Sequence, residues 1–193
     1  MKIILASHSK RRSMILSSCG IRHRVIVSRA KEFMTGKSPG SIVKKNACLK
    51  AELVAGKVKS GYVIGADTVV LLGKRIIGKP RNAKHAKNML KAFSGRMILV
   101  YTGLCIIDAK RQKKIIGCEK TELKVKKMSH TEILKYFRLL GPYDKAGGFS
   151  IEGVGSFIFD DIRGSYFNVL GLPMAKLNAM FKKIGVDILK IKI

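Results

Sequence analysis

The chain has 193 residues, of which 47% are hydrophobic, so it is long enough to bury the core of one domain. Its 39 Lys and Arg residues against 12 Asp and Glu residues give a net charge of +27, which indicates either polyanionic partners or a general bias toward lysine. There is no signal-peptide pattern and no run of ~18 apolar residues, so we expect neither export nor contact with a membrane.

The four cysteines show neither a paired spacing nor a zinc motif, so we expect reduced thiols in a cytoplasmic protein. The basic residues are spread along the chain and Trp is absent. This pattern argues against nucleic acid as the main partner.

Alternating strands and helices are predicted along the chain. Strands are expected at residues 2–6, 24–27, 62–72, 75–77, 97–107 and 115–125, and residues 147–168 read as strand-like. Helices are expected to begin near Arg11, at Pro39, after Asn82, after Ser129 and at Pro173. The alternation, with hairpins mixed in, predicts an α/β fold around a mixed sheet.

A short polar turn, SHSKRR from Ser7 to Arg12, follows the first predicted strand. Such a turn presents backbone N–H groups and the positive end of a helix to an anion. Ser7 and Ser9 would line it, and Arg11 and Arg12 would add charge-assisted donors for phosphate. The turn is not a P-loop, because the glycine spacing of that motif is absent. The alternative to an anion site is the start of a basic helix whose charged side chains contact only water.

Asp67 and Thr68 interrupt the apolar run YVIGADTVVLL at its centre. Burial of an unpaired carboxylate is costly, so a cation, a metal or a catalytic task must offset the burial. The alternatives are a buried ion pair and a carboxylate that binds a metal or activates water. Lys79, just after the following hairpin, would place a cation nearby.

Lys50 lies in the apolar stripe of the helix that is expected to begin at Pro39. Either its ammonium snorkels to water while its stem covers apolar surface, or the ammonium points toward phosphate in a cleft. The choice between these readings decides whether Lys50 belongs to the site.

Two glycine-rich stretches, residues 144–153 and 164–173, allow a ligand to approach the backbone closely, although turn formation explains glycines equally well. Lys145 and Glu152 lie in the first of them, and Glu152 is expected on an alternating, strand-like segment. Cations, a buried acid and glycine-rich loops together suit a nucleoside triphosphate site that includes a metal.

Six stretches carry a more specific signal, and together they resemble the Maf family of nucleoside triphosphate pyrophosphatases. They are LASHSKRRSMIL, KKNACLKAE, VIGADTVVLLGKRIIGKP, MLKAFSGRMILVYTG, YDKAGGFSIEG and GSYFNVLGLP. The resemblance implies a mixed α/β fold with an elongated sheet flanked by helices, ITPase-like, as one two-lobed domain over residues 1–193 with a central cleft. It also implies a house-cleaning hydrolase that converts a nucleoside triphosphate to the monophosphate and pyrophosphate with Mg²⁺ or Mn²⁺, often as a homodimer.

The resemblance also assigns roles to individual residues. Asp67 falls on the family's proposed catalytic base and Thr68 follows it. Arg11 falls on the first arginine of the family's turn, and Lys50 and Lys79 match its two lysines.

A metal-binding pair is implied as well, formed by Asp67 and by Glu32. Glu32 matches the acidic residue after the second strand with a spacing that is one residue short. Lys10 stands where the family usually has Pro, which should loosen the first turn.

The base specificity is mixed on these motifs. Position 152 is usually Gln in the dTTP/UTP branch and tends to be acidic in the 7-methyl-GTP branch, so Glu152 points to the 7-methyl-GTP branch. Position 11 tends to be Trp in the 7-methyl-GTP branch, so Arg11 points away from that branch. We expect dTTP, UTP or modified nucleotides as substrates, with 7-methyl-GTP as the alternative. The remaining alternative is a regulator of division arrest that binds nucleotide or nucleic acid without turnover.

Overall fold

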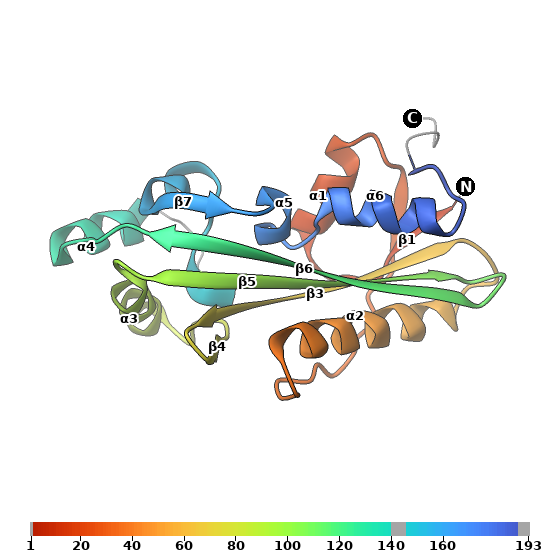
Figure 1. The fold of residues 1–193 in the computed structure, drawn as a ribbon, viewed down its shortest axis with the longest axis horizontal. Helices are drawn as coiled ribbons and strands as arrows, with labels where there is room; N and C mark the ends of the chain where they lie inside the picture. Colours follow the sequence, from red (N-terminus) through yellow and green to blue (C-terminus); the bar gives the residue numbers. More distant parts are fainter. Residues whose placement is uncertain (1, 140–145, 189–193) are drawn as a thin grey trace. The chain divides into compact units, whose positions relative to one another are not determined.

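The computed structural model describes residues 2–139 and 146–188 of the chain (Figure 1). Among these residues we find no helix with the length and apolar content that crossing a bilayer requires. The chain forms two compact units. The first comprises Met1–Thr68, Tyr101–Glu119 and Leu170–Ile193, and the second comprises Val69–Val100 and Lys120–Val169.

One mixed sheet of seven strands organises the described residues. Its order is β2 (His23–Val25), β1 (Ile3–Leu5), β3 (Tyr62–Leu72), β5 (Met97–Asp108), β6 (Lys113–Val125) and β7 (Phe159–Arg163), with β4 (Arg75–Ile77) also paired to β3. Strand β1 runs parallel to β2 and to β3, whereas β4 is antiparallel to β3 and β7 is antiparallel to β6. The predicted α/β fold with a mixed sheet flanked by helices is confirmed.

Helices lie on both faces of the sheet in the first unit. Helix α2 (Pro39–Ala55) covers one face and α6 (Met174–Lys183) the other, and α1 (Lys10–Ser18) follows β1 (Figure 1). Alternation along β3 explains this arrangement, because Tyr62 contacts Phe181 of α6 while Gly65 faces α2.

Helix α2 packs against the sheet at very short range because two strands present glycine to it. A Cβ atom added at Gly65 of β3 would lie 2.1 Å from the carbonyl oxygen of Ala47, and one at Gly103 of β5 would lie 2.3 Å from the carbonyl of Val43. Glycine is therefore required at both positions, since any side chain would push the helix away. The close approach fixes the height of α2 above β3.

The second unit contains α3 (Ala83–Phe93), α4 (His130–Leu139), α5 (Tyr166–Val169) and two 3₁₀ turns, Ala146–Gly148 and Gly153–Ile158. Its core includes edge-to-face contacts of Phe149 with Phe93 and with Phe159, at centroid distances of 6.1 and 5.3 Å. The expectation of strand through residues 147–168 is wrong except at β7. Positive φ angles at Gly147, Gly148 and Gly153 break any continuous strand there.

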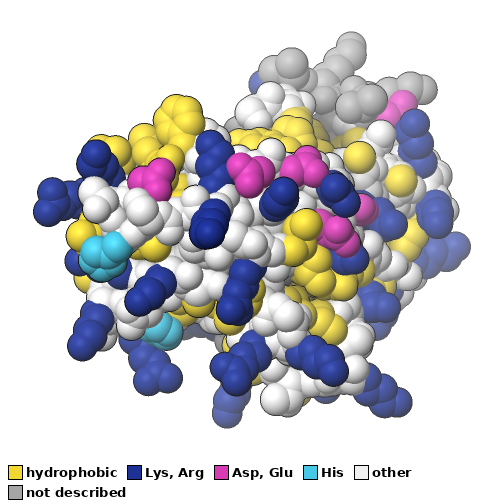
Figure 2. Space-filling model, turned by 60° about the vertical axis from the view of Figure 1, so that its left-hand side comes forward, with side chains coloured by type: hydrophobic (Ala, Val, Ile, Leu, Met, Phe, Trp, Pro, Cys, Tyr) yellow, Lys and Arg dark blue, Asp and Glu magenta, His cyan; other side chains and the backbone are white. Residues whose placement is uncertain are grey.

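Lysine and arginine side chains are scattered over the molecular face that Figure 2 draws, rather than gathered in one patch. Acidic side chains are few by comparison, in line with the composition. On this face, the distribution resembles a general excess of lysine more than a dedicated binding surface for a polyanion.

Candidate active site

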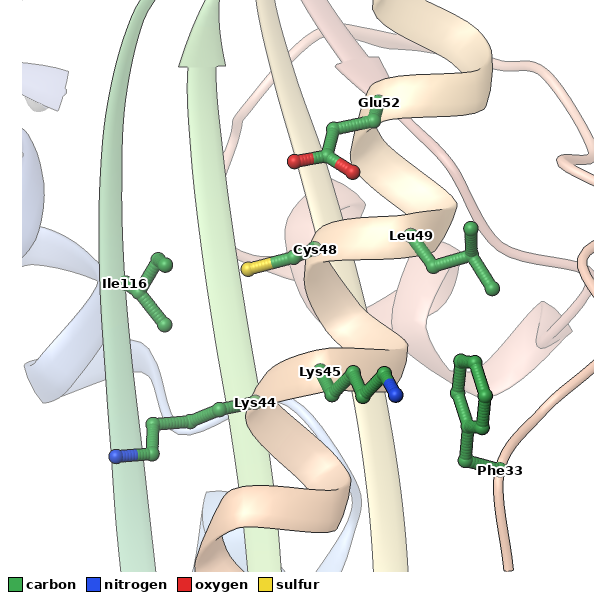
Figure 3. Close-up of a pocket in the computed structure, with 7 residues that line it drawn as sticks. All are labelled: Phe33, Lys44, Lys45, Cys48, Leu49, Glu52 and Ile116. Carbon is green, nitrogen blue, oxygen red and sulfur yellow. The ribbon is translucent and has the colours of Figure 1, made fainter.

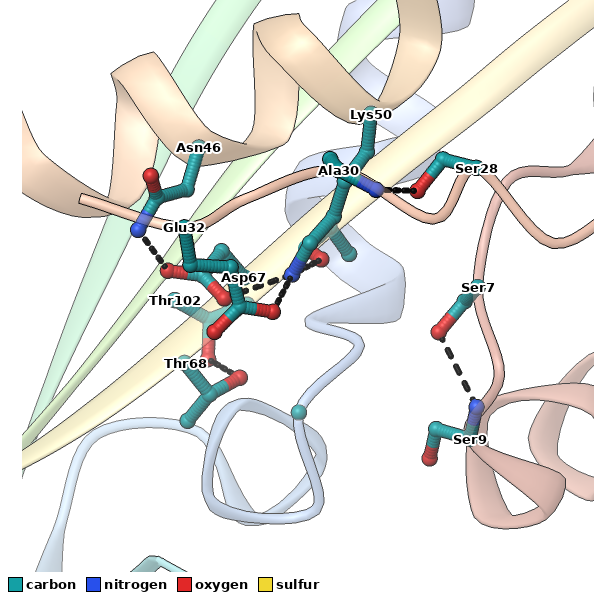
Figure 4. Close-up of polar contacts among 12 residues, drawn as sticks. Ser7, Ser9, Ser28, Ala30, Glu32, Asn46, Lys50, Asp67, Thr68 and Thr102 are labelled. Atoms are coloured by element: carbon teal, nitrogen blue, oxygen red, sulfur yellow. Dashed lines mark hydrogen bonds and ion pairs between the residues drawn. The ribbon is translucent and has the colours of Figure 1, made fainter. Parts of the chain in front are cut away.

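The buried carboxylate of Asp67 is paired on both of its oxygens. Asp67 is only 5% exposed, its Oδ1 accepts a hydrogen bond from Lys50 Nζ at 2.7 Å, and its Oδ2 accepts one from Asn46 Nδ2 at 2.8 Å (Figure 4). Both partners come from α2, and they lie four residues apart, on one face of the helix. The cost of burying Asp67 is therefore offset by an ion pair and a hydrogen bond.

Lys50 holds two carboxylates at once. Its ammonium contacts Asp67 Oδ1 and Glu32 Oε1, each at 2.7 Å, and donates to the carbonyl oxygen of Ala66 at 3.3 Å. These three acceptors match the three N–H bonds of an ammonium. The snorkelling alternative for Lys50 is wrong, because its charged end is buried against these groups.

Asn46 is a site residue that the sequence reasoning missed. Besides Asp67, its side chain binds the backbone of Phe33 twice: Oδ1 accepts from the Phe33 N–H at 2.8 Å and Nδ2 donates to the Phe33 carbonyl at 2.9 Å. Asn46 thus ties the segment that carries Glu32 to the helix that carries Lys50. The available signal was an amide in the apolar stripe of α2, one turn before Lys50.

The guanidinium of Arg12 forms a second buried network. It donates to the carbonyl oxygen of Gly171 at 2.7 Å, to Ser7 Oγ at 3.1 Å, to the Ala66 carbonyl oxygen at 2.9 Å and to Thr68 Oγ1 at 2.9 Å. Four of its five donors are therefore assigned to the protein. Arg12 is not the solvated arginine of a basic helix start, because it fixes the turn after β1 to β3.

The Lys50 network and the Arg12 network meet at the carbonyl oxygen of Ala66, which accepts from both cations. This oxygen lies just past the end of β1, whose last pairing with β3 joins Leu5 to Ile64. Burial lowers the pKa of Arg12, and the charges of Asp67 and Glu32 oppose that shift. Two cations and two carboxylates thus share the carboxyl edge of the parallel strands, where α/β proteins commonly bind ligands.

The turn from Ser7 to Ser9 is held by its own hydroxyl groups. Ser9 N–H donates to Ser7 Oγ at 3.2 Å, and Ser9 Oγ caps α1 by accepting from the Arg12 N–H at 3.4 Å. These two amides are therefore engaged within the turn. Arg11 is half-buried on the first turn of α1, next to Arg12.

The remaining expected binding residues are Lys79, Lys145 and Glu152. Lys79 and Glu152 belong to the second unit, and both are exposed. Glu152 precedes a 3₁₀ turn instead of lying in a strand, and its N–H donates to Ser150 Oγ at 3.2 Å. Lys145 lies outside the described residues.

The carboxylates of Asp67 and Glu32 are the only acids that the described network brings together around Lys50. Across residues 2–139 and 146–188, there is no group of three or more His, Cys, Asp and Glu side chains suited to a metal ion. The pair still fits Mg²⁺, because this ion is commonly held by one or two carboxylates together with substrate phosphates and water.

A family model described as Maf-like protein matches residues 2–184 of the chain. The dTTP/UTP pyrophosphatase of Dictyoglomus thermophilum is 36% identical over 190 residues, which cover 97% of this chain and 98% of the relative. That of Thermoanaerobacter sp. (strain X514) is 42% identical over 184 residues, 95% of this chain and 96% of the relative.

The structure of the Staphylococcus aureus Ham1 protein is similar in fold. It aligns with a TM-score of 0.54 at 14% identity and covers 95% of this chain and 100% of that chain. At such low identity the likeness concerns the fold alone, and it agrees with the predicted ITPase-like architecture.

Proposed function

The chain belongs to the Maf family, as its sequence motifs predicted, and from that premise we propose that it hydrolyses nucleoside triphosphates to the monophosphate and pyrophosphate. The observation that carries the proposal is the buried ion pair of Lys50 and Asp67, which the half-exposed Glu32 joins at the carboxyl edge of the parallel strands. A cluster of this kind supplies the fixed charges and positioning that phosphoryl transfer requires.

Asp67 is the proposed catalytic base. Lys50 and Asn46 hold its two oxygens, so the carboxylate is fixed in orientation before a substrate arrives. A carboxylate held in this way can orient a water molecule, or take a proton from it, for attack on the α-phosphorus. Thr68, which follows Asp67, is held by Arg12 and Thr102 on the other face of β3.

The phosphate chain would be bound by the remaining cations. The proposed contacts are Arg11, at the start of α1, Lys79, which follows β4, and Lys145, which belongs to the glycine-rich stretch 144–153. Lys50 would join them if a phosphate oxygen took the place of Glu32, which is its half-exposed partner. We propose that Arg12, Ser7 and Ser9 maintain the conformation of the turn that the substrate would contact.

A divalent cation, Mg²⁺ or Mn²⁺, is part of the proposal. Asp67 and Glu32 would hold it, and when bound it would neutralise charge on the triphosphate. The oxygen atoms of the two carboxylates retain lone pairs beyond those used by Lys50 and Asn46.

We propose dTTP and UTP as the substrates because relatives that match nearly the whole chain carry that name. The same names favour an enzyme over a non-catalytic regulator of division. Glu152 is the one sequence feature that points instead to 7-methyl-GTP. A homodimer and a cytoplasmic location, which the sequence also predicts, complete the proposal.

The test is a panel of dTTP, UTP, CTP and 7-methyl-GTP, each incubated with Mg²⁺, with Mn²⁺ and with a chelator. Release of pyrophosphate and of the matching monophosphate is measured for the natural chain and for Asp67→Asn. We expect turnover of dTTP and UTP that needs the metal and is lost in the variant. Salt-sensitive DNA binding without turnover of any nucleotide would replace this function with the regulatory one.

A further inference from the structure

Two cysteines come together in the packing between α2 and β5, where Cys48 packs against the buried cluster that contains Cys105. Cys105 is 0% exposed in the core under α2, and Cys48 of the helix packs against that core. The interaction between the two side chains is the largest influence on the pKa of each thiol. The contact follows from the glycine at position 103, which lets α2 descend onto β5 two residues away from Cys105.

Cys48 is also reached from outside the core. It lines a hollow of about 570 Å³ on the outer side of α2, together with Lys44, Lys45, Leu49, Glu52, Phe33 and Ile116 (Figure 3). In Figure 3 its sulfur points from the helix toward the strands, with Lys44 and Glu52 one turn away on either side. A small polar reagent in this hollow would meet the thiol of Cys48 but not that of Cys105.

The surroundings make the two thiols chemically unequal. The interaction with Cys105 is the main reason that the pKa of Cys48 is lowered; Lys114 and Lys44 act in the same direction, and partial burial opposes them. The same interaction, together with burial, raises the pKa of Cys105. A thiolate is the reactive form of cysteine, so Cys48 is the thiol prepared to react first.

The other two cysteines provide an internal comparison. Cys19 is exposed at the end of α1, and burial raises the pKa of Cys118. The hydrogen bond of Cys118 that the structure describes runs to the carbonyl oxygen of Glu119 at 3.7 Å. Cys19 thus serves as an exposed cysteine for comparison, and Cys118 as a partly buried cysteine whose pKa is raised instead of lowered.

We propose that Cys48 and Cys105 form a peroxide-reactive dithiol, with Cys48 as the attacking residue and Cys105 as the resolving residue. The Cys48 thiolate attacks one oxygen of hydrogen peroxide, the O–O bond breaks, and Cys48 becomes a sulfenic acid as hydroxide leaves. The sulfur of Cys105 then attacks the sulfur of Cys48. The proton of Cys105 leaves with the departing hydroxide as water, and a disulfide forms. Overall, both thiols are oxidised and the peroxide is reduced to water.

The dithiol lies on the helix that also holds the candidate active site. Asn46 and Lys50 flank Cys48 on α2, and both contact Asp67. Drawing Cys48 toward Cys105 would shift or twist this part of the helix, so oxidation would lower the proposed hydrolase activity. This consequence rests on the proposed function, whereas formation of the disulfide does not.

The test treats the natural chain and four variants (Cys48→Ser, Cys105→Ala, Cys19→Ser and Cys118→Ser) with hydrogen peroxide. Remaining thiols are counted after denaturation, and peptides are mapped by mass spectrometry before and after reduction. We expect a reducible link between the Cys48 and Cys105 peptides in the natural chain, in Cys19→Ser and in Cys118→Ser. Cys105→Ala removes the resolving thiol and also the main influence that lowers the pKa of Cys48, so we expect a slower reaction that stops at a sulfenic acid on Cys48, trapped with dimedone.

Cys48→Ser should slow oxidation of the chain by at least about tenfold, because the activated thiolate is removed. The proposal is overturned if no Cys48–Cys105 link forms while Cys19 is oxidised, or if Cys48→Ser is oxidised as fast as the natural chain. Loss of hydrolase activity is scored separately, so an inactive protein that still forms the link would leave the dithiol standing and contradict only the proposed function.

Discussion

Asp67 and Thr68 are neighbours in β3 that project to opposite faces of the sheet, and each is held by a different buried cation. Asp67 pairs with Lys50 at 2.7 Å, and Thr68 accepts from Arg12 at 2.9 Å. The two cations come together again at the carbonyl oxygen of Ala66, the residue just before this pair. Two consecutive residues of β3 therefore place a carboxylate and a hydroxyl group at the same edge of the sheet but on its opposite faces.

Substitution of Asp67 by Asn should abolish activity and lower stability. If the new amide oxygen faces Lys50, the new amide nitrogen faces Asn46 Nδ2, and two donors meet. Asn46 cannot simply turn, because its Oδ1 accepts from the Phe33 N–H at 2.8 Å. We expect a loss of about 1–3 kcal/mol in unfolding free energy and more than ~100-fold in turnover.

Pyrophosphate release and denaturant unfolding would measure both effects for Asp67→Asn. The matched control is Asp108→Asn, because Asp108 is also a buried acid of the first unit, but it accepts from the backbone amides of Lys110 and Arg111. That variant should lose stability and keep its activity. Near-normal turnover in Asp67→Asn would remove Asp67 from the role of base.

Substitution of Lys50 by Met should destabilise the protein strongly. The Met side chain replaces the apolar stem, but it leaves the Asp67 charge buried without its cation. Removing one partner of a buried ion pair typically costs about 3–5 kcal/mol. We therefore expect a large drop in Tm, and a loss of at least ~10-fold in kcat/KM measured well below that temperature.

The control for Lys50→Met is Lys114→Met. Lys114 pairs with Glu52 at the same 2.7 Å, yet the side chains are 42% and 48% exposed. An exposed pair contributes about 0–1 kcal/mol, so this variant should melt close to the natural chain. Equal Tm values for the two variants would mean that the Lys50 pair does not stabilise the fold.

Much of the fold could be predicted because local signals and packing agree. Ser38 caps α2, Asn82 caps α3, and Ser129 with Glu132 forms a capping box before α4, as expected. Strand β3 has the predicted bounds because its apolar residues are bounded by glycines. The region after residue 146 was misread, since its glycines adopt left-handed backbone angles that a pattern of apolar residues does not reveal.

The site was predicted less completely, for a physical reason. The sequence identified Lys50 and Asp67 as polar residues in apolar surroundings, and the structure joins them. It could not separate Arg11 from Arg12, because which of two adjacent helical residues faces the core depends on how α1 packs. The role of Asn46 was also hidden, since its main contacts are backbone atoms of Phe33, 13 residues earlier in the chain.

Asn46→Ala should loosen the segment that carries Glu32. The variant loses both bonds to the backbone of Phe33 and the bond to Asp67. We expect faster hydrogen exchange at the Phe33 amide and a kcat/KM reduced by about tenfold, as for the loss of a hydrogen bond to a charged group. Asn82→Ala, which removes the exposed cap of α3, should lower stability by about 1 kcal/mol without either effect. An unchanged exchange rate at Phe33 would refute the positioning role.

Glu152→Gln should shift base preference. A carboxylate only accepts hydrogen bonds, which suits the two adjacent donors of guanine, whereas Gln both donates and accepts, which suits thymine and uracil. We expect the ratio of kcat/KM for UTP to that for 7-methyl-GTP to rise by about tenfold, because unpaired groups at a base site are penalised strongly. Glu122→Gln, at a partly exposed acid of β6 in the same unit, is the control. An unchanged ratio in two active proteins would exclude Glu152 from the specificity site.

Gly65→Ala should disturb the site through the helix that carries it. The added methyl group would lie 2.1 Å from the carbonyl oxygen of Ala47 and 2.9 Å from the backbone nitrogen of Ala51, so α2 must move away from β3. Overpacking of this kind costs about 1–3 kcal/mol and sometimes more, and here the obstacle is helix backbone, which cannot rotate aside. Because Lys50 and Asn46 belong to α2, turnover should fall with stability.

In Gly78→Ala, an added Cβ meets nothing within 4 Å, so that variant should stay within about 0.5 kcal/mol of the natural chain in unfolding free energy. Denaturant unfolding of both variants decides the matter, and a Gly65→Ala protein as stable and active as Gly78→Ala would show that the close approach of α2 does not set the geometry of the site.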